Sequence, residues 1–561
     1  MNRFISSTRL PRALYSADQV RAIDRYAIEQ AGIPGAELMQ RAASVVLNVI
    51  LQRWPEVRCL LVVCGTGNNG GDGYLVAALA AMQGLNVRVL EPGAVERLSG
   101  AALSARQRVL AQSIACEPLP TGVAGGAAGV GAGVAAGGDA ALRAVHADTV
   151  VVDALLGIGM RGALRPEYRD AINWINGSGL PVVAVDIPSG LNSDTGVAAE
   201  VVVRAAVTVC FIGLKQGLLT ADGPDCSGEI VFHDLALPDL VLQSAPVRTM
   251  SASRIDVHSV AKLLPPRRPA THKGDCGHVL VVGGDVGYGG AALMAAEAAA
   301  RSGAGTVSLL TRAAHVTAML SRRPEVMVRA IEAPDGDDAE LVVRMIARAS
   351  VVVIGPGLGR SAWSSAMLRL VLQEAGQRIP LVVDADALNL LAEKRAQLTE
   401  LTSGGDLSRA PAGASGLRRQ NWVLTPHPGE AARLLGLSNE QVKADRFAAV
   451  RRLQELWGGA CLLKGAGSLL CFAESGVEGA LSRIEVCTEG NPGMATGGMG
   501  DVLSGMIGAF LAQGLSLADS LRCAVCIHGE SADLAAAAAG ERGLLPTDLL
   551  QHIRQLVNNS Q

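Results

Sequence analysis

The sequence is poor in aromatic and in charged residues. Only 3% of its 561 residues are aromatic and 18% are charged, whereas 49% are hydrophobic. This balance excludes a disordered chain and indicates a globular protein whose layers pack through small side chains. Because the formal net charge is only −3, the composition offers no attraction for nucleic acid or an anionic membrane, and we expect neither as a partner.

The sequence also lacks the features of a disulfide-stabilised, exported protein. Eleven cysteines are few for a chain of this length, and the opening stretch MNRFISSTRLPR has no apolar core typical of a secretory signal. We therefore expect reduced, buried thiols and a cytoplasmic location. The one CxxC motif, Cys523–Cys526, lies in an apolar helical stretch without a second cysteine pair, which favours a structural role over metal binding or redox chemistry.

No stretch has the composition of a transmembrane helix. The uncharged segment 118–138 is long enough to cross a bilayer, but it contains hardly any residue larger than valine and many glycines, which are poor helix formers. We interpret it as a Gly/Ala-rich surface insertion, and 403–418 as a second loop insertion.

A chain of 561 residues is too long for one ordinary hydrophobic core, and its pattern favours two domains. Both halves alternate short apolar runs that end in Gly or Asp, such as CLLVVCG and GHVLVVGG, with helical patterns. This alternation is typical of an α/β fold, in which helices cover both faces of a parallel sheet. A polar stretch with many prolines, 238–269, separates the halves, so we predict two three-layer αβα domains, 1–245 and 246–561.

The stretch GTGNNGGDG, residues 65–73, follows the first apolar run and precedes a helix expected from residue 73 onward. A glycine-rich turn there can dock an anion at the helix N-terminus, or can simply tighten a strand–helix corner. The spacing matches neither the dinucleotide-binding GxGxxG nor a P-loop. Polar residues also follow two later apolar runs, and such groups converge at the carboxyl edge of a parallel sheet. The sequence therefore predicts a ligand crevice formed by Asn69, Asp72, Asp153, Asp186 and Ser189.

The second half carries its own constellation, NPGMATGGMGDVLSG, which places small residues before Asp501 at the expected start of a helix. Backbone amides there can stabilise charge on a transferring phosphoryl group, while the carboxylate takes the proton of the acceptor. The alternative is a glycine run that serves helix packing. Because glycine costs about 1 kcal/mol inside a helix, this density favours a functional reason.

The motifs NNGGDG, VVDALLGIG and VDIPSG, in that order, resemble the YjeF N-terminal domain family of NAD(P)H-hydrate epimerases. The resemblance spans Tyr15 to about Leu237, apart from the Gly/Ala insertion. It implies a Rossmann-like domain that interconverts the R and S epimers of NADHX and NADPHX, the hydrated nicotinamide cofactors, with Asp186 in proton transfer.

The same resemblance implies a set of binding residues. Substrate is expected at Asn68, Asn69, Gly70, Gly71, Asp72, Gly157, Ile158, Gly159, Met160, Arg161, Gly162, Ala163, Tyr168 and Asp186. A potassium ion (K+) is expected at Asn69, Asp153 and Ser189, whose oxygen atoms suit a hard cation. For Ser189 the alternative is a simple helix or turn cap.

GGMGD in the second half resembles the anion-hole motif of ribokinase-like kinases. KGDCGHVLVVGG, IGPGLG, DADALN, TPHPGEAARLLG and LKGAGS narrow the resemblance to ADP/ATP-dependent NAD(P)H-hydrate dehydratases, over about Val257 to Leu556. It implies a ribokinase-like domain that phosphorylates the hydrate and then eliminates phosphate, with Mg2+ accompanying ADP or ATP.

This second resemblance assigns Asp501 as catalytic and implies two further sets of residues. The hydrate is expected at Ala291, Gly357, His427 and Asp501, and the nucleotide at Lys464, Gly465, Ala466, Gly467, Ser468 and Gly500. His427 lies between two prolines, so a structural turn residue is the alternative there.

The two resemblances together imply a chain that epimerises NAD(P)HX and then dehydrates the S form to NAD(P)H, with ADP giving AMP, or with ATP. The alternative is a ribokinase-like vitamin-precursor kinase fused to a non-catalytic Rossmann-like binding module. By analogy with both families we expect a homo-oligomer. The choice between ADP and ATP, and between NADHX and NADPHX, stays open.

Overall fold

The computed structural model describes residues 10–119, 148–160, 162–394, 417–473 and 482–558. Contacts divide the chain into two compact units, Met1–Ser253 and Arg254–Gln561, so the division falls a few residues beyond the expected 245. Most of both predicted insertions, and Arg161, lie outside the described residues. Among the helices of the described part, none combines the length and the apolar character needed to cross a membrane.

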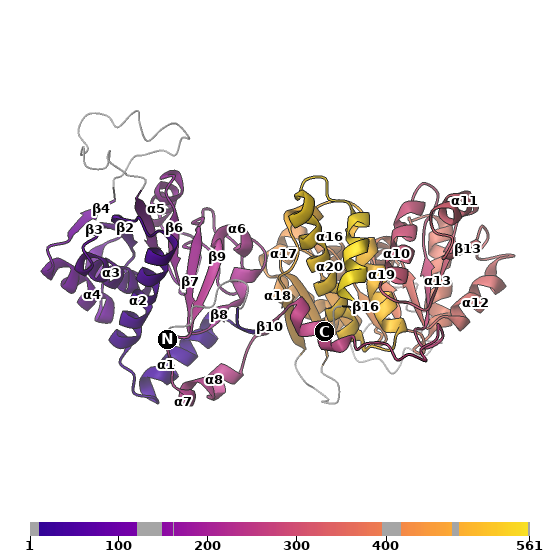
Figure 1. Ribbon diagram of the computed structural model, residues 1–561, viewed down its shortest axis with the longest axis horizontal. Coiled ribbons are helices and arrows are strands. Elements are labelled where there is room, and N and C mark those ends of the chain that lie inside the picture. Colours follow the sequence, from indigo (N-terminus) through magenta and orange to yellow (C-terminus); the bar gives the residue numbers. More distant parts are fainter. Residues whose placement is uncertain (1–9, 120–147, 161, 395–416, 474–481, 559–561) are drawn as a thin grey trace. The chain divides into compact units, whose positions relative to one another are not determined.

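The first unit is built on a parallel sheet in the order β4-β3-β2-β5-β6-β7-β9. Its inner strands β2, β5, β6 and β7 are apolar runs of the sequence and are buried because helices cover both faces (Figure 1), whereas the edge strand β4 is partly exposed. Their bounds are β2 Cys59–Cys64, β3 Asn86–Glu91, β4 Ala115–Pro118, β5 Thr149–Ala154, β6 Val182–Val185, β7 Val207–Phe211 and β9 Glu229–His233.

Alternate residues of each strand enter different cores. Val62 packs in a cluster with α2 and α3, whereas Val63 packs with Ile172 of α5 in a separate cluster, as the period-two geometry of a strand requires. The helices are α1 Ala17–Glu29, α2 Gly35–Arg53, α3 Asn68–Met82, α4 Gly100–Ala111, α5 Pro166–Gly177, α6 Gly223–Ser227, α7 Asp239–Leu242 and α8 Ala245–Arg248. Two short strands, β1 (Ala13–Tyr15) and β8 (Leu214–Lys215), pair in parallel and place Lys215 opposite Tyr15.

The second unit has a sheet in the order β13-β12-β11-β14-β15-β16-β17-β18-β19. Neighbours are parallel from β13 to β17, and β18 and β19 continue the sheet as antiparallel strands. The bounds are β11 His278–Val282, β12 Thr306–Thr311, β13 Met327–Ala330, β14 Val351–Ile354, β15 Leu381–Val383, β16 Trp422–Leu424, β17 Ala460–Leu463, β18 Ser468–Phe472 and β19 Arg483–Cys487.

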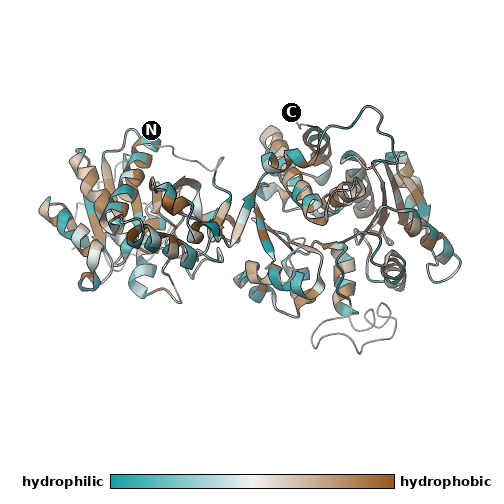
Figure 2. Cartoon of the chain, turned by 90° about the horizontal axis from the view of Figure 1, so that it is seen from below, coloured by the Kyte–Doolittle hydropathy of each residue, from teal (hydrophilic) through white to brown (hydrophobic). Residues whose placement is uncertain are grey.

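Helices cover both faces of this sheet, which confirms the predicted α/β class for both units. In Figure 2 hydrophobic residues concentrate in the strands and on the helix faces that meet them. The helices are α9 Val257–Val260, α10 Gly289–Arg301, α11 Ala313–Arg322, α12 Ala339–Arg348, α13 Ala362–Ala375, α14 Ala385–Glu393, α16 Pro428–Leu435, α17 Asn439–Ala444, α18 Arg446–Trp457, α19 Met499–Ala512, α20 Leu517–Ala539 and α21 Leu549–Leu556.

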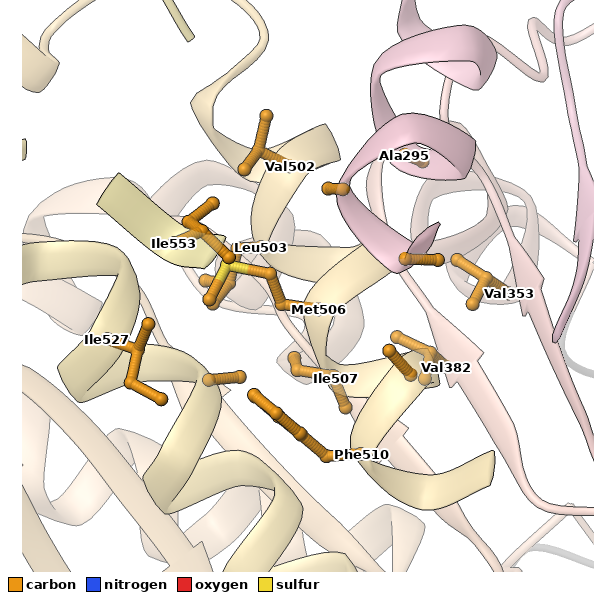
Figure 3. Close-up of a cluster of buried hydrophobic side chains, with 14 of the residues drawn as sticks. Ala295, Val353, Val382, Val502, Leu503, Met506, Ile507, Phe510, Ile527 and Ile553 are labelled. Atoms are coloured by element: carbon orange, nitrogen blue, oxygen red, sulfur yellow. The ribbon is translucent and has the colours of Figure 1, made fainter. Parts of the chain in front are cut away.

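Helix α19 is the centre of the second core. Figure 3 shows its residues Met506, Ile507 and Phe510 among side chains of α10, α20, α21 and the strands. A Cβ atom on Gly505 would lie 2.0 Å from the carbonyl oxygen of Ala295 in α10. Gly505 in the glycine run therefore serves helix packing, and only the residues before Gly505 are left as candidates for phosphoryl-group binding.

Candidate functional site

The first unit contains a cavity of about 730 Å³ at the carboxyl ends of its strands. Most of the predicted substrate residues line it, and they come from segments far apart in the sequence: Asn68, Asn69, Asp72, Gly157, Ile158, Gly159, Met160, Ala163, Tyr168 and Asp186. Gly70, Gly71 and Gly162 are not among its lining residues. Tyr168 is buried and its hydroxyl lies 3.1 Å from the Thr66 hydroxyl, at the cavity wall.

The glycine-rich stretch is not a loop up to residue 73, because helix α3 already begins at Asn68. Its glycines allow the start of this helix to press against the strand ends. A Cβ atom on Gly70 would lie 1.9 Å from the Gly65 carbonyl oxygen, and one on Gly65 would lie 1.9 Å from the Leu155 carbonyl oxygen. The backbone that these glycines approach is thus the protein's own, which corrects the expectation that this whole stretch forms a ligand-binding turn.

A charged group lies at the floor of the cavity. The buried Lys215 ammonium forms an ion pair with Asp186 and donates a hydrogen bond to the Phe211 carbonyl oxygen at 2.9 Å. Asp186 follows β6 with a positive φ of 68°, which is uncommon for a residue with a side chain and costs backbone energy. Such strain is typical of a position that the surrounding structure fixes for function.

Two further carboxyl groups line the same cavity, Asp24 of α1 and Asp72 of α3. Burial raises the pKa of Asp72 well above its usual range, and the charges of Asp186 and Asp24 raise it further. Burial and the charge of Asp186 also raise the pKa of Asp24. At Lys215 burial lowers the pKa, but the charges and hydrogen bonds of Asp186 and Cys210 together outweigh burial and leave the pKa raised. The group therefore combines one ammonium with carboxyl groups of which two, Asp24 and Asp72, have raised pKa values.

Asp153, Ser189 and Asn69, predicted to bind a cation, lie together beside this cavity. The Ser189 hydroxyl donates a hydrogen bond to Asp153 Oδ1 at 2.6 Å, and the Ser189 amide donates to Asp153 Oδ2 at 2.8 Å. Asn69 Nδ2 donates to the Leu156 carbonyl oxygen at 3.0 Å. Among the described residues its other amide atom, Oδ1, is buried without a hydrogen-bond partner. Burial raises the pKa of Asp153 to about 6 although Ser189 and Leu155 donate hydrogen bonds to it.

The second unit brings Asp501 into a cluster of charged groups at the N-terminus of α19. Lys464 Nζ donates to Asp384 Oδ1 at 2.7 Å and lies 4.0 Å from Glu430 Oε2. The Ser504 hydroxyl donates to the other oxygen of Asp384 at 2.6 Å. Burial and the charge of Asp384 raise the pKa of Asp501 to about 7.

The predicted nucleotide segment forms the tight turn between β17 and β18. Gly465 and Gly467 both have positive φ, 138° and 58°, which glycine adopts without a Cβ clash. The buried Arg446 guanidinium donates to the carbonyl oxygens of Leu463 at 3.3 Å and of Ala466, and so fixes the turn. A Cβ atom on Gly500 would lie 3.2 Å from Lys464 Nζ, so Gly500 and this turn do adjoin.

The predicted hydrate residues fall into two places. A Cβ atom on Gly357 would lie 3.1 Å from the Ala291 Cβ, so these two residues are adjacent. His427 is the N-cap of α16, and its Nδ1 accepts a hydrogen bond from the Gly429 amide at 2.9 Å. The structural role that was the alternative for His427 is therefore present. Its Nε2 lies 3.4 Å from Glu430, which connects it to the Lys464 cluster.

Several residues of these clusters were not predicted from the sequence. They are Asp24 and Lys215 in the first unit, and Asp384, Glu430 and Ser504 in the second. Lys215 carried a usable signal, because a lysine inside the apolar run VTVCFIGLKQGLL must be buried with a partner. Asp384 comes directly after β15, and Asp153 lies near the end of β5, so the rule that predicted Asp153 would have found Asp384.

Comparisons with known proteins agree with this two-site architecture. The family described as YjeF-related protein N-terminus matches residues 35–217, and the family described as NAD(P)H-hydrate dehydratase matches residues 279–555. A relative from Coxiella burnetii, named bifunctional NAD(P)H-hydrate repair enzyme, is 42% identical over 97% of this chain and 99% of its own length. A relative of the same name from Escherichia coli is 39% identical over 98% of this chain and 95% of its own.

Among solved structures, a ribokinase-like superfamily protein from Enterococcus faecalis is 29% identical, with a TM-score of 0.46, and covers 55% of this chain and 95% of its own. The relatives match along nearly their full length, and the two family matches fall one in each unit of the chain. The chain therefore belongs to the family of bifunctional NAD(P)H-hydrate repair enzymes.

Proposed function

We propose that the first unit interconverts the epimers of NAD(P)HX at the Asp186–Lys215 pair, and that the second unit dehydrates the S epimer at Asp501. The observation that carries this proposal is the separate charged centre in each unit, each with a buried or partly buried lysine against a carboxylate. A vitamin-precursor kinase joined to a binding module is the weaker alternative, because a module that only binds has no need of a buried ion pair in its cavity.

Epimerisation requires the C–O bond at C6 to break and form again, with a proton given to the leaving hydroxyl and taken from the returning water. The hydrate has its hydroxyl on C6 of the nicotinamide ring, beside the ring nitrogen, whose lone pair can expel the hydroxyl and let water return to either face. Asp186 is placed to exchange the proton, because Lys215 holds its carboxylate and balances its charge. The raised pKa of Asp72 favours a protonated carboxyl group at the same wall, so the site offers an acceptor and a donor.

Asn69, Asp153 and Ser189 fit a potassium ion. The fit rests on the chemistry of three oxygen donors and on Asn69 Oδ1, a buried acceptor that no described residue satisfies. Bound there, the ion would supply positive charge beside a buried carboxylate. Asn69 belongs to α3, Asp153 to the end of β5, and Ser189 to the segment after β6, so holding them together orders the cavity wall that carries Asn68 and Asp72.

Dehydration needs a better leaving group than hydroxide. We infer that Asp501 takes the proton of the C6 hydroxyl while the phosphoryl group is transferred to the hydroxyl oxygen. The pKa of Asp501, about 7, suits a general base near neutral pH. Lys464 reaches from the nucleotide turn to Asp384 and offers positive charge to the transferring group. Mg2+ would arrive with the phosphates of ADP or ATP. Loss of the C5 proton and of the phosphate on C6 then restores the 5,6 double bond of the nicotinamide ring.

The test is an assay of the purified chain on mixed NADHX epimers. We expect formation of NADH only when ADP or ATP is present, and epimer exchange without either nucleotide. The two donors, and NADHX against NADPHX, are compared by kcat/KM in the same assay, and light scattering tests the expected homo-oligomer. Phosphorylation of a vitamin precursor without any NADH formation would favour the alternative function.

A further inference from the structure

A cluster of two thiols and a carboxylate lies in the second unit, apart from the nucleotide turn. Cys487 ends β19, Glu489 follows it, and Cys526 lies on α20. Their ligand atoms all lie within 4.8 Å of one another, and Cys487 Sγ donates to Glu489 Oε2 at 3.3 Å. It is the one such grouping of three metal-ligating side chains within the described ranges. We propose that this cluster is a binding site for a soft divalent cation, Zn2+ or Cd2+.

The donor set suits such a cation. Two thiolates and one carboxylate are ligands that Zn2+ takes in proteins, and Zn–S and Zn–O distances of about 2.0–2.3 Å bring the ligand atoms of a tetrahedral site within a few ångströms of each other. The bare cluster is already close to that spacing. Three protein ligands leave a fourth position for water.

The cluster is built but open on one side. Cys487 and Cys526 are almost fully buried, with 1% and 0% exposure, whereas Glu489 is only partly buried. The carboxylate therefore provides the entry path for an ion. Its second oxygen accepts a hydrogen bond from the Val257 amide at the start of α9, which fixes the carboxylate from the other side.

Binding requires no oxidant or reductant. The S–H bonds of the two cysteines break, two metal–sulfur bonds form, and two protons pass to solvent; where Glu489 is protonated, its proton also passes to solvent as the carboxylate contributes one oxygen. Without an ion, burial raises the pKa of Cys526 well above its usual range and raises that of Glu489 to about 7. Both groups thus favour their protonated forms until a cation arrives.

The position gives the ion a structural effect. It would join β19 to α20 and, through Glu489, to α9. The chain continues from Glu489 directly into Gly490 and Asn491. The Gly490 backbone amide and the Asn491 side-chain amide both donate hydrogen bonds to the Asp533 carboxylate of α20. The metal would therefore anchor the segment that leads to Asp501, and the consequence is measured as stability, independent of the proposed catalytic function.

The chain contains matched controls. Cys461 and Cys471 are buried cross-strand partners on β17 and β18, and they belong to no grouping with a carboxylate among the described residues. Cys523 is the other cysteine of the CxxC motif, three residues before Cys526 on the same helix, yet it is not part of the cluster.

The experiment titrates full-length, chelator-treated, reduced protein with Cd2+, and follows the sulfur-to-cadmium charge-transfer absorbance. Competition with Zn2+ and a thermal melt with and without Zn2+ complete it. We expect one ion per chain and a higher Tm with Zn2+. C487S and C526S should weaken binding by about 10- to 100-fold or more and remove the Tm shift, whereas C471S and C523S should bind as the unaltered chain does.

E489Q provides a variant at the less buried ligand if a cysteine variant fails to fold, and it should also lose affinity and the Tm shift. The proposal is overturned if the unaltered chain binds no ion, if C471S or C523S loses binding as strongly as C487S, or if all of E489Q, C487S and C526S retain it. Loss of NADH formation in the repair assay would not affect any of these readouts.

Discussion

At the scale of the residue, each unit depends on a carboxylate whose neighbours change its chemistry. Asp186 lies beside a buried ammonium, whereas burial and neighbouring carboxylates raise the pKa of Asp501 to about 7. The first arrangement holds a charge in place, and the second prepares a group to take up a proton near neutral pH. Two different experiments follow.

We expect D501A to abolish nucleotide-dependent dehydration, with a loss of about 10²–10⁴-fold in kcat, while epimer exchange continues. In the unaltered chain the base must be ionised, so the rate of dehydration should fall as pH falls through about 7, the pKa of Asp501. A stopped assay of NADH formation across this range measures both. A dehydration rate in D501A close to that of the unaltered chain would contradict the assignment.

Lys215 offers a sharper test of the first site. K215M leaves Asp186 near Asp24 and Asp72 without its cation, and removing one partner of a buried pair costs about 3–5 kcal/mol at full burial. Because Asp186 is partly exposed, we expect less than this in urea unfolding, together with loss of epimerisation. The double variant K215M/D186N should regain stability but not activity. A double variant as unstable as K215M alone would show that the ion pair is not the cause.

At the scale of the element, the start of α3 shows where sequence reasoning stopped. The glycines were expected to form a ligand-binding turn, yet Gly65 and Gly70 are required by contacts between the helix and the strand ends. A sequence shows that side chains are missing but not which atoms take their place, because strand register sets those contacts. The strands themselves were predictable, since an apolar run buried on both faces has no other suitable environment.

We predict that G70A destabilises the chain by about 3 kcal/mol or more, because its Cβ would meet the Gly65 carbonyl oxygen at 1.9 Å and overpacked backbone has little room to move. G67A is the control, since no atom lies within 4 Å of the Cβ position there and its φ is −102°. Urea unfolding of both variants compares them. Equal stability of G70A and G67A would mean that the helix start shifts freely.

The potassium site joins three elements, so its prediction also belongs to this scale. Replacing K+ with tetramethylammonium should slow epimerisation and leave dehydration unchanged, because Asn69, Asp153 and Ser189 all lie in the first unit. N69A removes the unsatisfied Oδ1 and should make epimerisation insensitive to the choice of cation. If the loss of K+ lowers both activities equally, the ion acts elsewhere.

At the scale of the whole molecule, the family and the α/β class could be predicted from the sequence, and most of the predicted substrate residues do line the first cavity. The members of each charged cluster could not, because Lys215 and Asp186 are 29 residues apart and Lys464 and Asp384 are 80 apart. Their pairing depends on which strands lie side by side. Periodicity identifies a strand but not its neighbours.

The two activities on one chain imply a division of labour. A site that aligns one hydroxyl with a phosphate accepts one epimer, since a misplacement of about 1 Å can cost about 10²-fold. With mixed epimers and excess ADP, the unaltered chain should consume the whole pool. D186N should consume S quickly and leave R, which then disappears only as fast as uncatalysed exchange permits. Chiral chromatography follows both epimers, and a single fast phase in D186N would contradict the scheme.

The glycine contacts at the start of α3 also bear on how function is assigned to genes that carry this motif. Gly65 and Gly70 are needed for the helix to reach the sheet at all, so a descendant that had lost every catalytic group would still have to retain them in order to fold. The presence of these two glycines in a gene thus indicates the fold and says little about catalysis. An annotator who wishes to separate working epimerases from silent copies should inspect the positions of Asp186 and Lys215, which selection is free to discard once the reaction is no longer required.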